Sequence, residues 1–119
     1  MTDLEIMKLC AEALSKKTKM LPSMHGNFDV LCIEVEGKKD TWYSYNPLYD
    51  DAQAMALDSV LIDETHSISF HQAWFCRHEY PSGLLTFEFH ADMTQPENRR
   101  RARCECVAKM QLSKQKSAA

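Results

Sequence analysis

The stretch YSYNPLYDDAQAMALDSVL, residues 43–61, decides the fold. Pro47 has a fixed φ and disfavours the helical conformation at Asn46, so a strand that enters this stretch must end there. Asp50 is placed to cap a helix, and Gln53 follows three residues later, where the second partner of a capping box belongs. The stretch therefore predicts a strand, a tight corner and a helix. The expected buried stripe of that helix is Ala52, Met55, Ala56, Leu57, Val60 and Leu61.

The N-terminal part of the chain predicts a helix followed by a hairpin. A Thr-x-x-Glu capping box opens an amphipathic segment over residues 2–17. Pro, Ser and Gly in residues 18–27 predict a loop. Residues 28–35 and 41–45 are rich in β-forming side chains on either side of an EGKK turn, and predict two paired strands. Apolar residues on both faces of the strand over 28–35 indicate that both are covered, the second in part.

The C-terminal part predicts three more strands and a last helix. The segment YPSG at residues 80–83 predicts the turn between the second and third of these strands. Thr94 with Glu97 forms a further capping box, and the helix that it opens is expected to end at about Leu112. The predicted ranges are 66–70, 72–80 and 84–90 for the strands and 113–119 for a frayed tail.

These elements, in the order α-β-β-α-β-β-β-α, predict one α+β domain over residues 1–112. We expect a mostly antiparallel sheet of four or five strands with helices packed on one or both of its faces. Of the 119 residues, 45% are hydrophobic and 26% are charged, which is typical of a soluble globular domain.

Composition favours an intracellular protein. No apolar run approaches the roughly 20 residues of a membrane span, and the N-terminus is acidic, unlike a signal peptide. The five cysteines are an odd set without a CxxC pair, so we interpret them as reduced thiols: Cys10, Cys32, Cys76, Cys104 and Cys106. The expected location is the cytoplasm. The net charge of −3 does not indicate a nucleic-acid-binding protein.

No motif predicts catalysis, a cofactor or a metal. Cys76 and His78 lack the second ligand pair that a zinc site requires. Glu88 and His90 are outward positions of a strand, where polar side chains are expected in any case. The three glycines are isolated, so no Gly-rich phosphate loop is present. We therefore expect neither an enzyme nor a cofactor.

Two charged groups of side chains are candidates for binding. The first combines aromatic residues, which are enriched at binding hot spots, with acidic residues that capping does not explain. It consists of Trp42, Tyr45, Tyr49, Asp58, Asp63 and Glu64. The hypothesis is that these residues bind a partner protein, while the alternative is that much of the aromatic set is core.

The second group is the arginine cluster, Arg99, Arg100, Arg101 and Arg103. Positive charge in the first turn of a helix opposes the helix dipole, so helix stability does not explain it. Binding of nucleic acid or of an acidic partner is one reading. Pairing with nearby acidic residues, including those of the central helix, is the other.

The layout of these elements resembles the phage ABA-sandwich family, the NinX-like small proteins of bacteriophages. The resemblance rests on Tyr45-Asn46-Pro47 with Asp51-Ala52, on Trp74 in a strand, and on the segment from Arg101 to Glu105. It implies a phage or prophage origin and supplies no catalytic residues. The resulting expectation is an accessory protein that binds a host protein, for example a component of a defence system, in the bacterial cytoplasm. The alternative is a nucleic-acid-binding protein that uses the arginine cluster.

Overall fold

The computed structural model describes residues 1–24, 26–63, 68–70, 73–80, 83–92 and 94–118, with the side chains of 61–90 and of 117–118 excepted. The helices are α1 (Asp3–Ala13), α2 (Asp51–Met55), α3 (Asp58–Asp63) and α4 (Pro96–Ala118). The strands are β1 (Thr18–Pro22), β2 (Asp29–Glu34), β3 (Trp42–Ser44), β4 (Ile68–Phe70), β5 (Ala73–Tyr80) and β6 (Gly83–His90). The α+β class is confirmed.

The described strands form two antiparallel sheets, so the prediction of one sheet of four or five strands is wrong. The first sheet has the order β1-β2-β3 and the second has the order β4-β5-β6. Strand β1 lies in the segment 18–27 that was predicted to be a loop. It is an edge strand whose side chains are mostly exposed, so no alternation of apolar and polar residues marks it. It is held in place by pairing with β2, in a register that sets Thr18 opposite Ile33.

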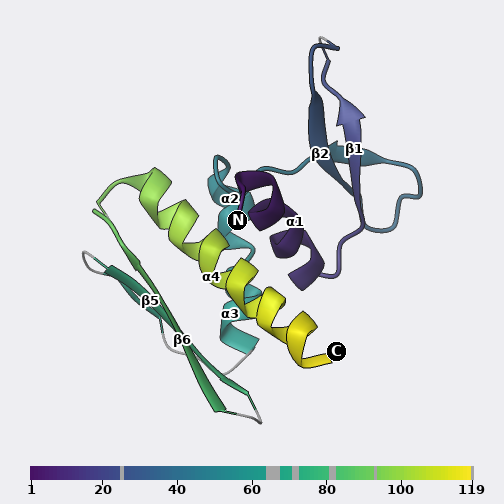
Figure 1. Cartoon of the computed structure of the whole chain (residues 1–119). Helices are drawn as coiled ribbons and strands as arrows, with labels where there is room; N and C mark the ends of the chain where they lie inside the picture. The colour runs from purple at the N-terminus through teal and green to yellow at the C-terminus, as the bar shows by residue number, and fades with distance from the viewer. Residues whose placement is uncertain (25, 64–67, 71–72, 81–82, 93, 119) are drawn as a thin grey trace.

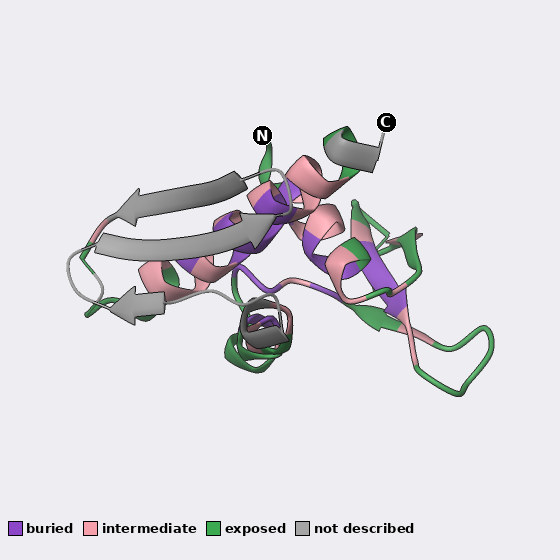
Figure 2. Cartoon of the chain, turned by 90° about the horizontal axis from the view of Figure 1, so that it is seen from below, coloured by how far each residue is buried: buried purple, intermediate pink, exposed green. Residues whose placement is uncertain are grey.

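Helices α1 and α4 lie side by side between the two sheets (Figure 1). They run in the same direction, since Arg101 bonds to Asp3 near one end and Gln115 bonds to Glu12 near the other. Strand β2 packs against α1, and the second sheet packs against α4. The buried residues follow α4, α1 and β2 through the middle of the molecule (Figure 2). The largest fully buried side chains include Ile6, Leu57, Val107 and Met110.

The corner at Pro47 is confirmed, together with the cap at Asp50. The Oδ1 atom of Asp50 accepts a hydrogen bond from the backbone N–H of Gln53 at 2.9 Å. The Gln53 side chain reaches back across the corner to the end of β3. Its Oε1 accepts from the N–H of Asn46 at 2.6 Å, and its Nε2 donates to the carbonyl of Ser44 at 2.9 Å. These bonds fasten the helix to the strand that precedes it.

The single helix predicted after the corner is wrong, because it is broken into α2 and α3. The N–H of Leu57 bonds to the carbonyl of Ala54, and the N–H of Ser59 bonds to the carbonyl of Ala56. The hydrogen bonds at the break therefore span three residues, as in a 3₁₀ turn, and not the four of an α-helix. Ala54 and Leu57 are buried, while Met55 is 59% exposed. The expected stripe is therefore wrong at Ala52, Met55 and Ala56, which are exposed.

Both terminal helices differ in length from the prediction. Helix α1 is capped by Thr2, as predicted, but ends at Ala13, and Ser15 adopts a left-handed φ of 59°. Helix α4 continues past Leu112, so residues 113–118 are helical and not a frayed tail. Only good or neutral helix formers follow Leu112, which explains the extension. Helix α4 begins at Pro96. The Thr94 hydroxyl donates to Oδ1 of Asp92, a residue that is not part of the predicted capping box of Thr94 and Glu97.

Candidate functional site

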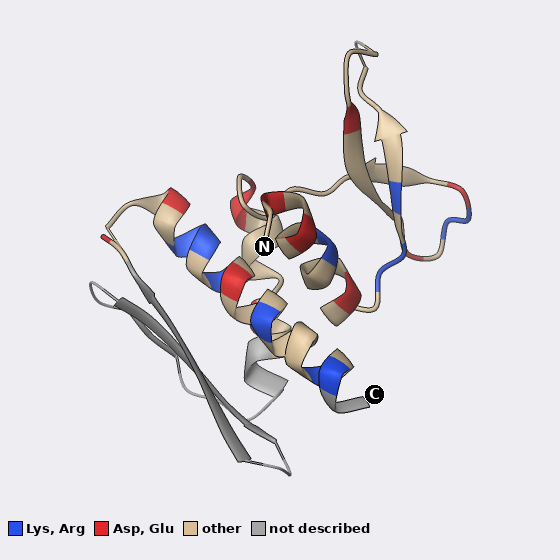
Figure 3. Ribbon diagram, in the orientation of Figure 1, with Lys and Arg blue, Asp and Glu red and all other residues tan. Residues whose placement is uncertain are grey.

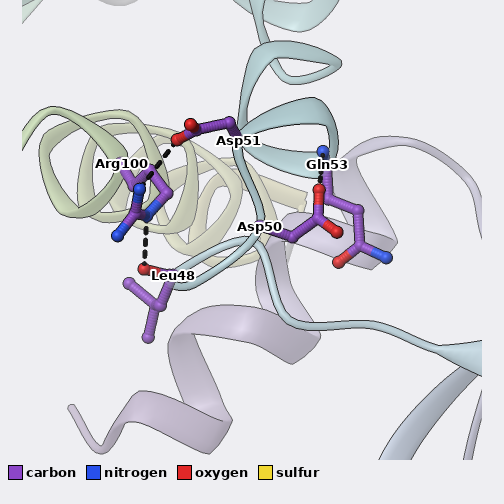
Figure 4. A network of polar contacts seen from close by, with 5 residues as sticks. All are labelled: Leu48, Asp50, Asp51, Gln53 and Arg100. Carbon is purple, nitrogen blue, oxygen red and sulfur yellow. Dashed lines mark hydrogen bonds and ion pairs between the residues drawn. The ribbon is translucent and has the colours of Figure 1, made fainter. Parts of the chain in front are cut away.

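The arginine cluster joins α4 to the other helices. Arg100 reaches the corner before α2: its Nε donates to the carbonyl of Leu48 at 3.0 Å and its Nη1 to Asp51 Oδ1 at 2.8 Å (Figure 4). Its side chain is only 16% exposed. Arg103 donates from Nε to Asp58 Oδ1 at 3.0 Å and is 14% exposed. The pairing with acidic residues of the central helical segment, one of the two readings of the sequence, is present.

Arg101 ties α4 to the start of α1. Its Nη2 lies 2.9 Å from Asp3 Oδ1, and its Nε lies 3.9 Å from Glu105 Oε2. The hydrogen bond to Asp3 raises the pKa of the Arg101 guanidinium above its ordinary value. The basic first turns of α4 thus lie beside the acidic starts of α1 and α2 (Figure 3). The unfavourable interaction of these arginines with the dipole of α4 is offset by carboxylates from neighbouring elements.

A cavity of about 200 Å³ lies between α2 and the start of α4. Its lining is Asp51, Ala54, Met55, Pro96, Arg99, Arg100 and Arg103. Because Arg100 and Arg103 are each paired with a carboxylate, much of the positive charge on this lining is balanced within the chain. Met55 brings an exposed apolar side chain to the same place.

The described members of the aromatic and acidic group differ in their exposure and contacts. Tyr45 is 3% exposed and belongs to the core, so its assignment as a contact residue is wrong. Trp42 lies on β3, half-buried, with the Lys19 Nζ 5.7 Å from the centre of its ring. Tyr49 is 73% exposed just before α2, and Asp58 is paired with Arg103.

Some of the predicted candidates cannot be placed. They lie outside the described residues: the side chain of Asp63, the whole of Glu64, and the side chains of Cys76, His78, Glu88 and His90. Among the residues that are described, no group of three or more His, Cys, Asp or Glu side chains is arranged to hold a metal. None of the described helices combines the length and the hydropathy that a bilayer span requires.

A group of titratable side chains is buried where α1, α4 and the end of β3 meet. Cys10 Sγ donates to the carbonyl of Cys104 at 3.4 Å, and both cysteines are fully buried. Hydrogen bonding with Cys104 and burial raise the pKa of the Cys10 thiol well above its ordinary value. This thiol is therefore protonated at neutral pH and is a poor nucleophile. Cys106 is disulfide-bonded, so the prediction that all five cysteines are reduced is wrong there.

Replacing Tyr45 by phenylalanine tests whether its buried hydroxyl destabilises the folded state. The Tyr45 hydroxyl is buried without a hydrogen-bond partner among the described residues, and burial raises its pKa well above the ordinary value. Because an unsatisfied buried hydroxyl destabilises the folded state, Tyr45→Phe should leave the free energy of unfolding at pH 7 unchanged or raise it by up to about 1 kcal/mol. Urea titration followed by circular dichroism measures this.

The same variant has a signature at alkaline pH. An unfolded tyrosine loses its proton near pH 10, while folded Tyr45 keeps it, so the wild type loses stability as the pH rises above about 10. Cys10 acts with the same sign from about pH 8.5. The loss between pH 7 and pH 11 should be smaller in Tyr45→Phe than in the wild type. An equal loss would show that Tyr45 titrates alike in both states.

Comparisons with protein-family models, curated proteins and solved structures found no match to this chain. The resemblance to the phage ABA-sandwich family stays a prediction.

Proposed function

We propose that this protein acts by binding another protein through the surface around α2. We call this the α2 surface and define it by Tyr49, Asp50, Asp51 and Met55. The observation that carries the proposal is the exposure of two large side chains there, 73% for Tyr49 and 59% for Met55. Tyrosine and methionine are enriched at protein interfaces, and tyrosine buries a large area there at little cost in conformational freedom.

Charge supports a partner with basic residues. Residues 40–76 contain neither lysine nor arginine, and Asp50 and Asp51 are both exposed on the α2 surface. Asp51 is paired with Arg100 yet keeps 70% of its side chain in solvent. An apolar pair with acidic neighbours fits a partner with an apolar contact bordered by lysine or arginine.

The setting that we propose is that of a phage or prophage accessory protein in the bacterial cytoplasm, with a host protein as its target. A component of a host-defence system is one such target. The geometry gives little support to the nucleic-acid alternative, since Arg100, Arg101 and Arg103 each pair with a carboxylate of this chain. Phosphate contacts there would have to replace those pairs.

The test is affinity capture from bacterial lysate at physiological salt, with the partner identified by mass spectrometry and then titrated in purified form. We expect Tyr49→Ala with Met55→Ala to weaken binding at least about thirtyfold, the effect of a hot spot of 2 kcal/mol. Tyr43→Ala is the matched control, because Tyr43 is also exposed, at 44%, but lies on β3. Capture of nothing above background would refute the proposal. Recovery of nucleic acid instead would favour the alternative.

A further inference from the structure

The register of the first sheet sorts its side chains onto two faces. Residues paired across antiparallel strands share a face, and successive residues alternate. Cys32 pairs with Lys19 on one side and with Ser44 on the other, while Leu21 pairs with Val30 and Trp42 with Glu34. We call the face that carries these pairs the outer face. Its apolar or partly apolar members are Lys19, Leu21, Phe28, Val30, Cys32 and Trp42.

Helix α1 packs against β2 on the inner face of the sheet. The outer face is not part of the same core. Leu31 and Ile33 on the inner face belong to the core cluster that includes Ile6 and Cys10 of α1. Within the described part of the chain, neither that cluster nor the side chains packed against it include Val30 or Trp42. The apolar pattern of β2 predicted cover on both faces, on the second only in part. Leu31 and Ile33 are buried on the inner face. On the outer face Cys32 is 5% exposed and Val30 is half-buried, so the cover there is partial.

The outer face is more apolar than a solvent-facing sheet surface requires. An antiparallel sheet with one face in water normally carries polar residues on that face. Here Val30 and Cys32 lie on β2, with Leu21 and Trp42 on the flanking strands. Phe28 directly precedes β2, and its carbonyl accepts from the N–H of Ser23 at 2.8 Å, which continues the register by one step and puts Phe28 on the same face. Phe28 is 62% exposed, and Val30, Leu21 and Trp42 are half-buried. The sheet stands away from the helices on this side (Figure 1).

The dimensions of this face match one helix. Three strands about 4.8 Å apart span about 10 Å, and five or six residues at about 3.3 Å each span roughly 17–20 Å. An α-helix is about 10–12 Å wide and three of its turns are about 16 Å long. Helix α1, with 11 residues, packs against the middle strand, β2, on the inner face. A stable pair of copies needs about 800 Å² from each chain, far more than this face alone provides.

The charge at one end of the outer face is positive. The carbonyl of Lys17 accepts from the N–H of Glu34, which continues the register by one step and puts Lys17 on the same face as Lys19. Both lysines are exposed, whereas Glu34 is half-buried. The Lys19 ammonium lies over the ring of Trp42, at the border of the apolar stripe. Acidic side chains of a bound segment would meet Lys17 and Lys19 there.

We propose that the outer face of the first sheet binds an amphipathic helix of a partner protein, about three turns long, with acidic residues beside its apolar stripe. The bound helix completes a three-layer arrangement with the sheet in the middle. The inference goes beyond the α2 surface, because it rests on other residues and fits the opposite charge. Failure of one proposal leaves the other unaffected.

The experiment is selection from a display library of random 16-residue peptides against the full-length protein, followed by titration of the enriched peptides. We expect apolar residues spaced at i, i+3 or i+4, and i+7, with a net negative charge. Phe28→Ser should weaken their binding at least about tenfold and Lys19→Glu about fivefold. Both side chains are exposed, so the variants should melt at the wild-type temperature.

Three matched controls lie outside the outer face. Met20→Ser changes an exposed apolar residue of the inner face, Lys39→Glu reverses an exposed charge of the β2–β3 loop, and Tyr49→Ser removes the aromatic ring of the α2 surface. All three should bind the selected peptides as the wild type does. The proposal is overturned if no peptide is enriched, if the enriched peptides carry no acidic bias, or if the controls weaken binding equally. It is also overturned if sedimentation shows a dimer that Phe28→Ser dissociates, because a second copy would then cover this face.

Discussion

Replacing Leu57 by alanine should lower the free energy of unfolding by about 3 kcal/mol, within the usual range of about 2–5 for a buried leucine. Leu57 is fully buried and lies in the turn between α2 and α3, in the same core cluster as Val107 of α4. Truncation removes apolar contact and leaves a cavity that the rigid α4 cannot close. The loss is a large fraction of the total stability of a domain of this size.

The matched control is Met55→Ala, two residues away. Met55 is 59% exposed, so its truncation should change the free energy of unfolding by no more than about 0.5 kcal/mol. Urea unfolding followed by circular dichroism measures both variants. If Met55 were buried, as the stripe expected from the sequence had it, its truncation would cost about as much as that of Leu57. That outcome would contradict the exposure of Met55 on α2.

Features controlled by neighbouring residues could be predicted from the sequence. Pro47 limits its own φ and the conformation of Asn46, and Asp50 caps the N–H three residues on, so the corner needs no distant contact. The hairpin of β2 and β3 is marked in the same local way, while residues 81–82 of the predicted YPSG turn lie outside the described residues. The break at Leu57 has no such mark, since neither Gly nor Pro occurs between Pro47 and Asp63. Leu57, at this break, packs in the same core cluster as Val107 of α4, a distant contact that the local sequence does not show.

Features that depend on distant partners could not be predicted. Strand β1 exists through its register with β2, and nothing in its own residues separates it from a loop. The division of the strands into two sheets depends on which strand neighbours which, and alternation within a strand does not specify that. Tyr45 and Tyr49 look equivalent in the sequence, yet the first is buried and the second is exposed.

The candidate site shows the same division. The sequence marks the arginine cluster and both acidic neighbours of the corner, but it does not tell a binding arginine from a structural one. The deciding contacts span long distances in the chain: Arg100 meets Leu48 and Arg103 meets Asp58. Only the folded chain shows that these side chains are already engaged.

Replacing Arg100 by alanine should lower the free energy of unfolding by about 2 kcal/mol. The guanidinium bonds at once to the carbonyl of Leu48, a buried residue, and to Asp51. Removal leaves that carbonyl without its charged donor and strips the packed stem of the side chain from α4. Arg100→Lys should lose about half as much, because an ammonium cannot hold both partners in the planar geometry of Arg.

The control for Arg100 is Asp51→Asn, which removes the ion pair and leaves the bond to Leu48. Asp51 is 70% exposed, so solvent screens the pair and the variant should lose no more than about 0.5 kcal/mol. Urea unfolding at 0.05 and 0.5 M NaCl separates the two contributions, since salt should leave most of the Arg100→Ala loss in place. Equal losses in both variants that vanish in high salt would make Arg100 a surface ion-pair partner. It would then be free to meet a phosphate, and the nucleic-acid alternative would regain support.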